Sequence, residues 1–450
     1  MLSRINDVSS GILVPIALIL CGIFYGIRLG FFHVLHPIRV LQGLLPKKKS
    51  GGVSSVKAVT LALAGTLGVG NIVGVSSAIA LGGFGAIFWM WISALVAMIL
   101  KYAEIVLAMR HRRYDENGKP LGATMYYILD FFSSRRMKTV GTIVSSAFAV
   151  CFLVCALTMG SMLQADAISS SLEGTFGISP TITGAVLCVL TFIIYRCGTS
   201  GILSLTNLII PVMSLGYILI SVIIIVKNAA QLPYAFELIL GSAFSLNAAA
   251  GGIGGYIFLF AIRYGVMRGL VSNEAGCGTA PTAHAIADCD SPARQGLWGI
   301  FEVFVDTVIL CTMTALVVIL KYDDAALFRE NYMMMTTAAF EAGIGRAAGY
   351  FLSVSVACFG FATIVCWIHY CTSSLNFLRA RKGVVCAFMC LYCLCTFLGS
   401  TASSEISWLL SDLSMGIMTL INLCVIVPMW REVKEETQML FEKQTKKIAR

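Results

Sequence analysis

Long apolar stretches alternate with short polar connections along nearly the whole chain. A stretch of about 20 apolar residues is what an α-helix needs to cross the hydrocarbon core of a bilayer. The pattern predicts eleven such spans, near residues 9–32, 56–80, 84–109, 140–170, 179–195, 201–226, 243–266, 295–320, 347–377, 383–398 and 404–429. The longest polar stretches, about 110–138 and 321–346, are too short to form separate domains. The sequence therefore predicts an all-α polytopic membrane protein with one transmembrane domain over residues 1–450.

The composition and the placement of charge agree with this prediction. Only 12% of the residues are charged and 58% are hydrophobic, whereas a soluble domain carries about 25% charged residues. We count 25 of the 32 Lys and Arg residues in alternate connections and in the tail 430–450. By the positive-inside rule, this asymmetry predicts an external N-terminus and a cytoplasmic C-terminus in the plasma (inner) membrane. The net charge of +9 follows from that topology, so it does not indicate nucleic-acid binding.

The second predicted span is interrupted by the sequence GTLGVGNIVG, residues 65–74. Each glycine inside a helix costs about 1 kcal/mol relative to alanine, and unwound backbone at membrane depth is tolerated only where it is buried in protein or lines a cavity. Freed amide groups suit a carboxylate, and freed carbonyls suit a cation. Asn71 adds a side-chain oxygen of the kind that a hard cation prefers. The interruption thus favours a site for a zwitterionic amino acid and a cation, with close helix packing as the alternative.

The chain also divides into two similar halves. After an extra helix at 9–32, residues 56–226 and 243–429 each contain five predicted spans. Because five is odd, the two halves enter the membrane from opposite sides. Each half opens with a glycine-interrupted helix, the second one at NAAAGGIGGYIF, residues 247–258. Paired interrupted helices in inverted repeats are a pointer to the central site of a transporter.

Charged residues inside the spans need partners. Lys101 and Glu104 are three residues apart on one helix face, and we expect them to pair with each other. Asp306 lies in an apolar helix, and Arg268 or Arg294 could pair with it.

Uncharged polar residues inside the spans suggest ligand contacts. Gln164 could orient a polar ligand through its donor and its acceptor. Thr363 and Trp367, four residues apart, could offer a hydroxyl and an indole to a small ligand with one polar end, although core packing explains Trp367 equally well.

Several motifs resemble the alanine or glycine:cation symporter family. They are GVGNIVGVSSAIALGGFGAIFWMW, MLQADAI, IRYGVMRGLVSNEAGCGTAPTAHA and RQGLWGIFEVFVDTVILCTMTALV, in the family's order over about residues 55–430. The resemblance implies ten helices in a LeuT-like 5+5 inverted-repeat fold with one extra N-terminal helix, and cation-driven uptake of small amino acids. It implies substrate contacts at Gly70, Asn71, Ile72, Gln164, Thr363 and Trp367. Candidates for cation binding or gating are Gly68, Asn71, Thr312, Asn273 and Asp306.

The sequence departs from the family pattern at three places, Asn207, Cys366 and Thr372, and these leave the substrate open. We predict a secondary active symporter for a small neutral amino acid, alanine or glycine first and glutamine or a D-amino acid otherwise. The coupling ion is Na⁺, with H⁺ as the alternative carried by Asp166 or Asp306. The other expected partner is the lipid bilayer, with no nucleic acid, metal or further cofactor. A passive channel or a membrane enzyme fits less well, because neither repeated filter sequences nor clustered catalytic side chains occur.

Overall fold

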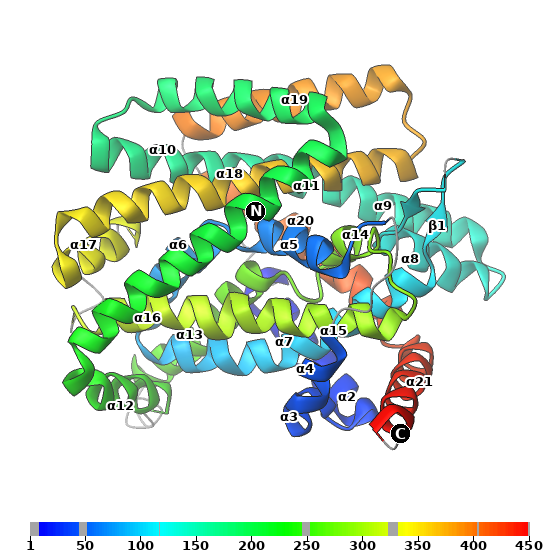
Figure 1. Ribbon diagram of the computed structural model, residues 1–450, viewed down its shortest axis with the longest axis horizontal. Helices are drawn as coiled ribbons and strands as arrows, with labels where there is room; N and C mark the ends of the chain where they lie inside the picture. Colours follow the sequence, from blue (N-terminus) through cyan, green and yellow to red (C-terminus); the bar gives the residue numbers. More distant parts are fainter. Residues whose placement is uncertain are drawn as a thin grey trace.

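The computed structural model describes residues 9–44, 52–116, 118–244, 253–322, 332–402 and 405–448. These residues form a bundle of helices with one short hairpin, and most of the long helices run roughly along the horizontal direction of Figure 1. Among the described residues, eight helices are long and apolar enough to cross a membrane, and one broken helix pair adds a ninth candidate. The structure thus agrees with the predicted all-α membrane protein.

The N-terminal segment forms one span and two short helices outside it. η1 (Ser9–Leu13) leads into α2 (Val14–Leu29). Gly30 and Phe31 have φ of 69° and 45°, in the left-handed region that ends helices. The chain therefore turns away from α2 into α3 (Phe32–Leu35) and α4 (Pro37–Leu44).

The predicted interruption of the next span is confirmed. α5 (Ser55–Thr66) is bent by 63° relative to the segment Val69–Gly82, which ends in α6 (Val73–Gly82). Between α5 and α6 lies only the short helix η2 (Val69–Asn71). We call residues 67–72 the first break.

The rest of the first half consists of long helices and a small hairpin. α7 (Gly85–Arg110) is followed by β1 (Arg113–Tyr114) and β2 (Pro120–Leu121), which pair antiparallel with Arg113 opposite Leu121. Then come α8 (Thr124–Ser133), α9 (Lys138–Leu157), the π-helical segment η3 (Thr158–Met162), α10 (Leu163–Phe176) and α11 (Pro180–Lys227). α11 contains a break at Gly198, with φ 65° and ψ −164°, which separates the predicted spans 179–195 and 201–226.

Interruptions also occur in the second half. After η4 (Ala229–Gln231) and α12 (Leu232–Ala243) come α13 (Ile253–Asn273), α14 (Ala280–His284), α15 (Pro292–Val303), the π-helical η6 (Phe304–Cys311) and α16 (Thr312–Ile319). The predicted glycine cluster 247–258 falls partly outside the described residues, and from Ile253 its backbone is helical. The interruption that the structure does show lies at 274–279, where Glu274, Gly276 and Gly278 have φ of 52°, 84° and 80°. We call residues 274–279 the second break.

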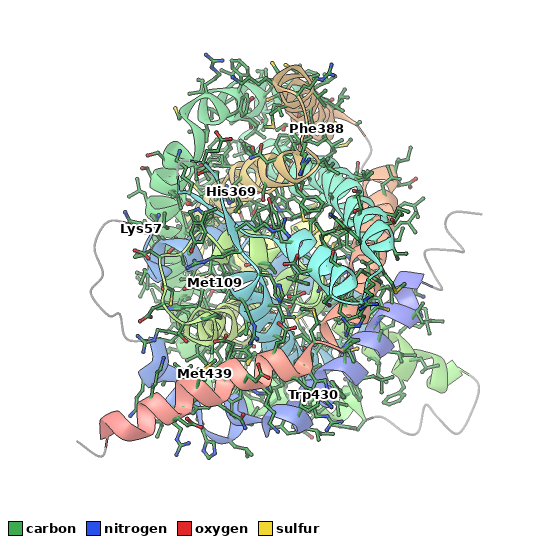
Figure 2. The ribbon with its side chains drawn as sticks, turned by 90° about the vertical axis from the view of Figure 1, so that its right-hand side faces the viewer. Lys57, Met109, His369, Phe388, Trp430 and Met439 are labelled. Carbon is green, nitrogen blue, oxygen red and sulfur yellow. The ribbon has the colours of Figure 1, made fainter. Side chains whose placement is uncertain are left out.

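The remaining helices complete the bundle. They are α17 (Tyr332–Ile344), α18 (Arg346–Phe377), α19 (Lys382–Thr401), α20 (Glu405–Ile426) and α21 (Trp430–Ile448). α21 lies across the end of the molecule that faces the viewer in Figure 2, where Lys57, Met109 and His369 also lie.

The packing of α13 corrects one part of the predicted topology. A Cβ on Gly265 would lie 2.3 Å from the Ala86 carbonyl oxygen, and one on Gly269 would lie 2.5 Å from the Ser93 hydroxyl. α13 and α7 therefore run in the same direction, and the span predicted to end at 266 continues to Asn273. Arg263 and Arg268 consequently lie toward the end opposite Arg110. The count of 25 Lys and Arg residues had included Arg263 and Arg268 on the same side of the membrane as Arg110, and that part of the count was wrong.

Candidate functional site

Two side chains from other helices hold the chain at the first break. The Val69 N–H donates to Oε1 of Gln164 over 3.2 Å, and Nε2 of Gln164 donates to the Met159 carbonyl over 3.1 Å. The Thr363 hydroxyl donates to the Ala64 carbonyl over 2.9 Å. Gln164 and Thr363 thus replace bonds that an unbroken helix would make internally.

Gly68 lies between these two side chains. A Cβ at this position would lie 2.8 Å from Thr363 Oγ1 and 2.9 Å from Gln164 Oε1, closer than real Cβ atoms come. Only glycine therefore lets both side chains reach the backbone. In contrast, a Cβ on Gly74 would meet no atom within 4 Å, so that glycine is not required by packing.

Trp367 lies one turn after Thr363 on α18 and packs against η3. Its indole lies against the backbone of Gly160, where a Cβ would be 2.5 Å from the ring. The ring also contacts Phe152 and Tyr370 edge-on, at centroid distances of 5.4 and 5.3 Å. Trp367 is fully buried, and its indole N–H has no hydrogen-bond partner among the described residues. An unpaired buried donor is costly and is one group that a ligand could satisfy.

A polar cluster lies on the other side of the first break, around Asn71. Asn71 Nδ2 donates to Asp306 Oδ1 over 2.8 Å and to the Ser272 hydroxyl over 3.1 Å. The hydroxyls of Ser272 and Thr307 donate to Asp306 Oδ2 over 2.8 and 2.7 Å. The Thr314 hydroxyl donates to the Asn71 backbone carbonyl over 2.9 Å. We call Asn71, Ser272, Asp306, Thr307 and Thr314 the amide–carboxylate cluster.

One atom of this cluster has no partner. Asn71 is only 5% exposed, and its Oδ1 accepts no hydrogen bond from any described residue. Asp306 is fully buried, and the donors it receives in this structure come from neutral groups. The predicted pairing of Asp306 with Arg268 or Arg294 was therefore wrong. A buried carboxylate and a free amide oxygen side by side can both coordinate a monovalent cation.

A π-helical segment supplies a hydrogen-bonding carbonyl on each side of the first break. η3 supplies the Met159 carbonyl that Gln164 bonds, and η6 supplies the Asp306 carbonyl, which accepts from Asn71 Nδ2 over 3.1 Å. A π-helical turn shifts its hydrogen bonds by one residue, leaves carbonyls available and is frequent at functional sites.

The buried charges are connected differently from the prediction. Lys101 pairs with Glu302 rather than with Glu104, at 2.7 Å between Nζ and Oε1, and also donates to the Asn273 carbonyl over 2.6 Å. Glu302 Oε2 is bonded by His284 over 3.0 Å. Lys101 and Glu104 lie on one helix face, but different helices pack against each of them, so tertiary contacts decided the partners.

Glu104 and Glu274 complete the buried charge around the second break. Glu104 accepts from the Gly278 N–H over 2.9 Å and from Asn422. Glu274 is 1% exposed, and neither of its carboxylate oxygens accepts a hydrogen bond from the described residues. The positive φ of Glu274 explains why α13 ends at Asn273.

The remaining predicted site residues differ in how close they lie to this cluster. Asn273 is joined to it, because its Nδ2 donates to the Thr307 hydroxyl over 3.1 Å. A Cβ on Gly70 would lie 3.4 Å from Ser272 Cα, and Ile72 is buried beside it. Thr312 points elsewhere and accepts from the Trp91 indole over 2.8 Å.

Ser272 and Thr314 were not among the predicted site residues. In the sequence, Thr314 differs from Thr312 only in the helical face on which it lies. Ser272 sits where α13 ends, and only the packing of α13 against the first break brings it to Asn71.

A cavity of about 990 Å³ opens at the end of the molecule that carries Lys57 and His369. We call this cavity the vestibule. Two of the departures from the family pattern, Asn207 and Thr372, line it, whereas the third, Cys366, donates to the Leu61 carbonyl over 3.1 Å beside the first break. On α18, Cys366 and Tyr370 therefore lie against Gly65 of α5, while His369 and Thr372 line the vestibule.

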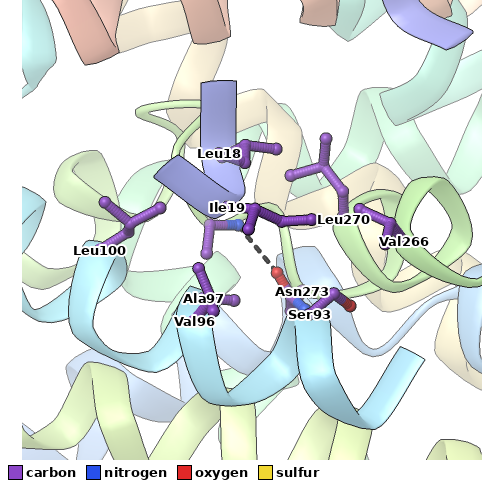
Figure 3. Close-up of a pocket in the computed structure, with 10 residues that line it drawn as sticks. Leu18, Ile19, Ser93, Val96, Ala97, Leu100, Val266, Leu270 and Asn273 are labelled. Carbon is purple, nitrogen blue, oxygen red and sulfur yellow. Dashed lines mark hydrogen bonds between the residues drawn. The ribbon is translucent and has the colours of Figure 1, made fainter. Parts of the chain in front are cut away.

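A second, much smaller cavity lies behind the second break. Figure 3 shows its apolar lining, contributed by α2, α7 and α13, and the hydrogen bond from the Ala275 N–H to Asn273 Oδ1 of 3.0 Å. Its volume of about 20 Å³ is enough for about one water molecule and far too small for an amino acid. α2 thus supports the second break by packing, since a Cβ on Gly276 would lie 2.3 Å from Leu18 Cδ2.

The apolar spans, the two breaks and the vestibule define a multi-pass membrane transporter, not an enzyme. The chain belongs to the sodium:alanine symporter family, whose model matches residues 1–450. It is 34% identical over 450 residues to the sodium/alanine symporter AgcS of Methanococcus maripaludis, covering 98% of this chain and 97% of that one. It is 31% identical over 432 residues to the probable sodium/glutamine symporter GlnT of Bacillus subtilis, covering 94% and 86%. A solved structure of a Na⁺-coupled sialic acid symporter matches with a TM-score of 0.52 and 11% identity over 94% of this chain and 82% of that one, a likeness of fold.

Proposed function

We propose that the protein couples the inward movement of Na⁺ to the uptake of a small neutral amino acid, alanine or glycine, by alternating access. The observation that carries the proposal is the first break, with hydrogen-bonding groups on one side and the amide–carboxylate cluster on the other. AgcS, whose name gives sodium and alanine, matches this chain over nearly its full length and supports the choice.

The cation belongs at the amide–carboxylate cluster. Asp306 supplies the negative charge, and Asn71 Oδ1 is a free acceptor beside it. Oxygen donors of this kind suit a hard cation such as Na⁺. Binding of Na⁺ there would replace the hydrogen bonds that Asp306 now receives and would fix the position of Asn71.

The amino acid belongs at the opposite side of the break. Gln164 and Thr363 flank Gly68, Trp367 follows Thr363 by one turn on α18, and all three side chains are at most 5% exposed. In this closed arrangement Gln164 accepts from the Val69 N–H and Thr363 donates to the Ala64 carbonyl. A substrate carboxylate could replace Gln164 at the first group, and a substrate ammonium could replace Thr363 at the second. Movement of Trp367 and Tyr370 would connect the site to the vestibule, which we place on the cytoplasmic side by the positive-inside rule.

We propose eleven spans in two inverted halves as the framework of this movement. Each predicted span has a helical counterpart among the described residues, with α11 covering two of them across its break at Gly198. The first and second breaks meet in space, since the Asn71 amide bonds Ser272 at the end of α13.

Two alternatives remain within the same fold. The similarity to GlnT makes glutamine the second substrate to examine. Coupling to H⁺ would use Asp306, whose neighbours could accommodate a protonated carboxyl, or Asp166, which is half-buried on α10.

The test is uptake of labelled alanine into proteoliposomes under an inward Na⁺ gradient or an inward H⁺ gradient, each imposed alone. We expect concentrative uptake with Na⁺ only, and in Asn71→Ala a rise of at least tenfold in the Na⁺ concentration for half-maximal uptake. Asn228→Ala is the matched control, because that amide bonds only Ile224 and Lys321 far from the break. Uptake driven by H⁺ alone, or an unchanged Na⁺ requirement in Asn71→Ala, would contradict the assignment of the cation site.

A further inference from the structure

A cavity of about 310 Å³ lies between the end of α2, the short helices α3 and α4, and the C-terminal helix α21. It is separate from the vestibule and from both breaks. Its lining contains three cationic side chains, Arg28, Arg39 and Lys434, and no acidic residue. Its volume lies at the lower end of the range for small-molecule sites.

The three cations are not neutralised within the described part of the chain. None of them forms an ion pair with a carboxylate there. Three of the four acidic residues of α21 are used elsewhere, since Arg110 pairs with Glu432, Glu435 and Glu436 at 3.2 to 3.5 Å. The fourth, Glu442, is exposed and does not line the cavity, whereas Lys434 does.

The sequence of α21 produces the face that lines the cavity. The residues that line the cavity are Lys434, Thr437, Gln438 and Phe441, which are spaced three, four and seven apart and lie on one side of a helix. On the other wall, the guanidinium of Arg28 stacks over the Trp430 ring at 4.5 Å, which holds its charge in place.

The short helices beside the cavity expose three apolar side chains that do not line it, and we call these three the apolar rim. Leu35, Ile38 and Leu41, on or beside α4, are 65%, 69% and 58% exposed. Phe32 and Phe441 contact each other inside the cavity at a centroid distance of 5.2 Å. An exposed apolar strip next to unpaired cations, at the end of a membrane span, is the arrangement of an interfacial helix in contact with lipid.

We propose that this cavity binds the headgroup of an anionic phospholipid, with the phosphate between Arg28, Arg39 and Lys434 and the acyl chains along α4. Basic cavities beside membrane spans attract anionic headgroups, and each Lys or Arg near the surface contributes about a fivefold gain in affinity. A free phosphate ion would use the same charges but would leave the apolar rim uncovered, so the lipid is the occupant the structure favours. A bound lipid would tie α2 to α21, the first and the last long helices of the chain.

The test measures thermal unfolding of the full chain in detergent while dioleoyl phosphatidylglycerol, dioleoyl phosphatidylcholine or inorganic phosphate is added. The test variant carries Arg28→Gln, Arg39→Gln and Lys434→Gln. The control carries Lys138→Gln, Arg381→Gln and Lys382→Gln, the same charge change at exposed positions outside the cavity. We expect phosphatidylglycerol to stabilise the wild type and the control, with an apparent affinity about a hundredfold weaker in the test variant.

Three outcomes would overturn the proposal. They are equal binding of phosphatidylglycerol by the test and control variants, equal stabilisation by phosphatidylcholine, and full stabilisation by inorganic phosphate at millimolar concentration. If the triple variant does not fold, the single variant Arg39→Gln on the exposed helix α4 gives the same test with an expected fivefold loss.

Discussion

Replacing Gln164 by leucine tests whether the Gln164 side chain stabilises the first break or only binds substrate. Gln164 accepts from the Val69 N–H and donates to the Met159 carbonyl, and it is 5% exposed. Leucine has a similar volume but neither group. The substitution therefore leaves two buried backbone groups without partners.

The size of the effect follows from these two bonds. An unsatisfied buried donor or acceptor costs about 1–3 kcal/mol, so Gln164→Leu should lower the free energy of unfolding by about 2–6 kcal/mol. Gln164→Glu keeps the acceptor for Val69 but loses the donor for Met159, and we expect an intermediate loss. Thr372→Val is the control, because its hydroxyl bonds only the Ile368 carbonyl of its own helix and its removal should cost less than about 1 kcal/mol.

The assay is thermal unfolding of the purified full chain, combined with uptake kinetics in proteoliposomes. We expect the unfolding midpoint to fall in the order Thr372→Val, Gln164→Glu, Gln164→Leu. An unfolding midpoint of Gln164→Leu equal to that of Thr372→Val, together with a raised KM for the amino acid, would refute the reasoning. Gln164 would then contact substrate without supporting the break.

Three further predictions follow from other contacts. Gly68→Ala should lower the free energy of unfolding by about 1–3 kcal/mol, because the added methyl group would push Thr363 and Gln164 off the backbone. Gly74→Ala is the control and should be neutral or stabilising, since a Cβ there has open space. Equal unfolding midpoints for the two variants would contradict this prediction. Lys101→Met should cost about 3–5 kcal/mol by leaving Glu302 unpaired, and adding Glu302→Gln should restore part of the loss, so a double variant less stable than Lys101→Met would refute the pairing. Burial lowers the pKa of His111, but hydrogen bonds and charges from Asp130 and Glu432 outweigh it and raise that pKa to about 9. This contact should therefore stabilise the fold fully below about pH 6.5 and lose its effect as the pH rises through 9, and a His111→Gln variant should lack that part of the pH dependence of the unfolding midpoint.

The sequence by itself determined the class of all-α membrane protein and the position of the first break. Apolar stretches of bilayer length can only be helices, because backbone polar groups have no water to bond at that depth. Four glycines within residues 65–74 likewise predict unwinding wherever the chain is packed. Asn71, Gln164, Thr363 and Trp367 stood out because polar or indole groups at membrane depth need partners. The structure brings Gln164 and Thr363 to the break that contains Asn71, whereas Trp367 packs against Gly160, one turn from Thr363.

Only the tertiary structure decided which groups face one another. Lys101 was equally able to reach Glu104 along its own helix, but the packing of α15 against α7 gives it Glu302 instead. Thr312 and Thr314 are chemically identical but lie on different faces of one helix. Thr312 therefore bonds Trp91, whereas Thr314 bonds Asn71. An interruption was predicted within 247–258, of which the structure describes only the helical part from Ile253; the break that it shows follows Asn273, where Glu274 takes a left-handed conformation among buried neighbours. Periodicity and composition describe one helix at a time, whereas a partner across the bundle depends on how the helices pack.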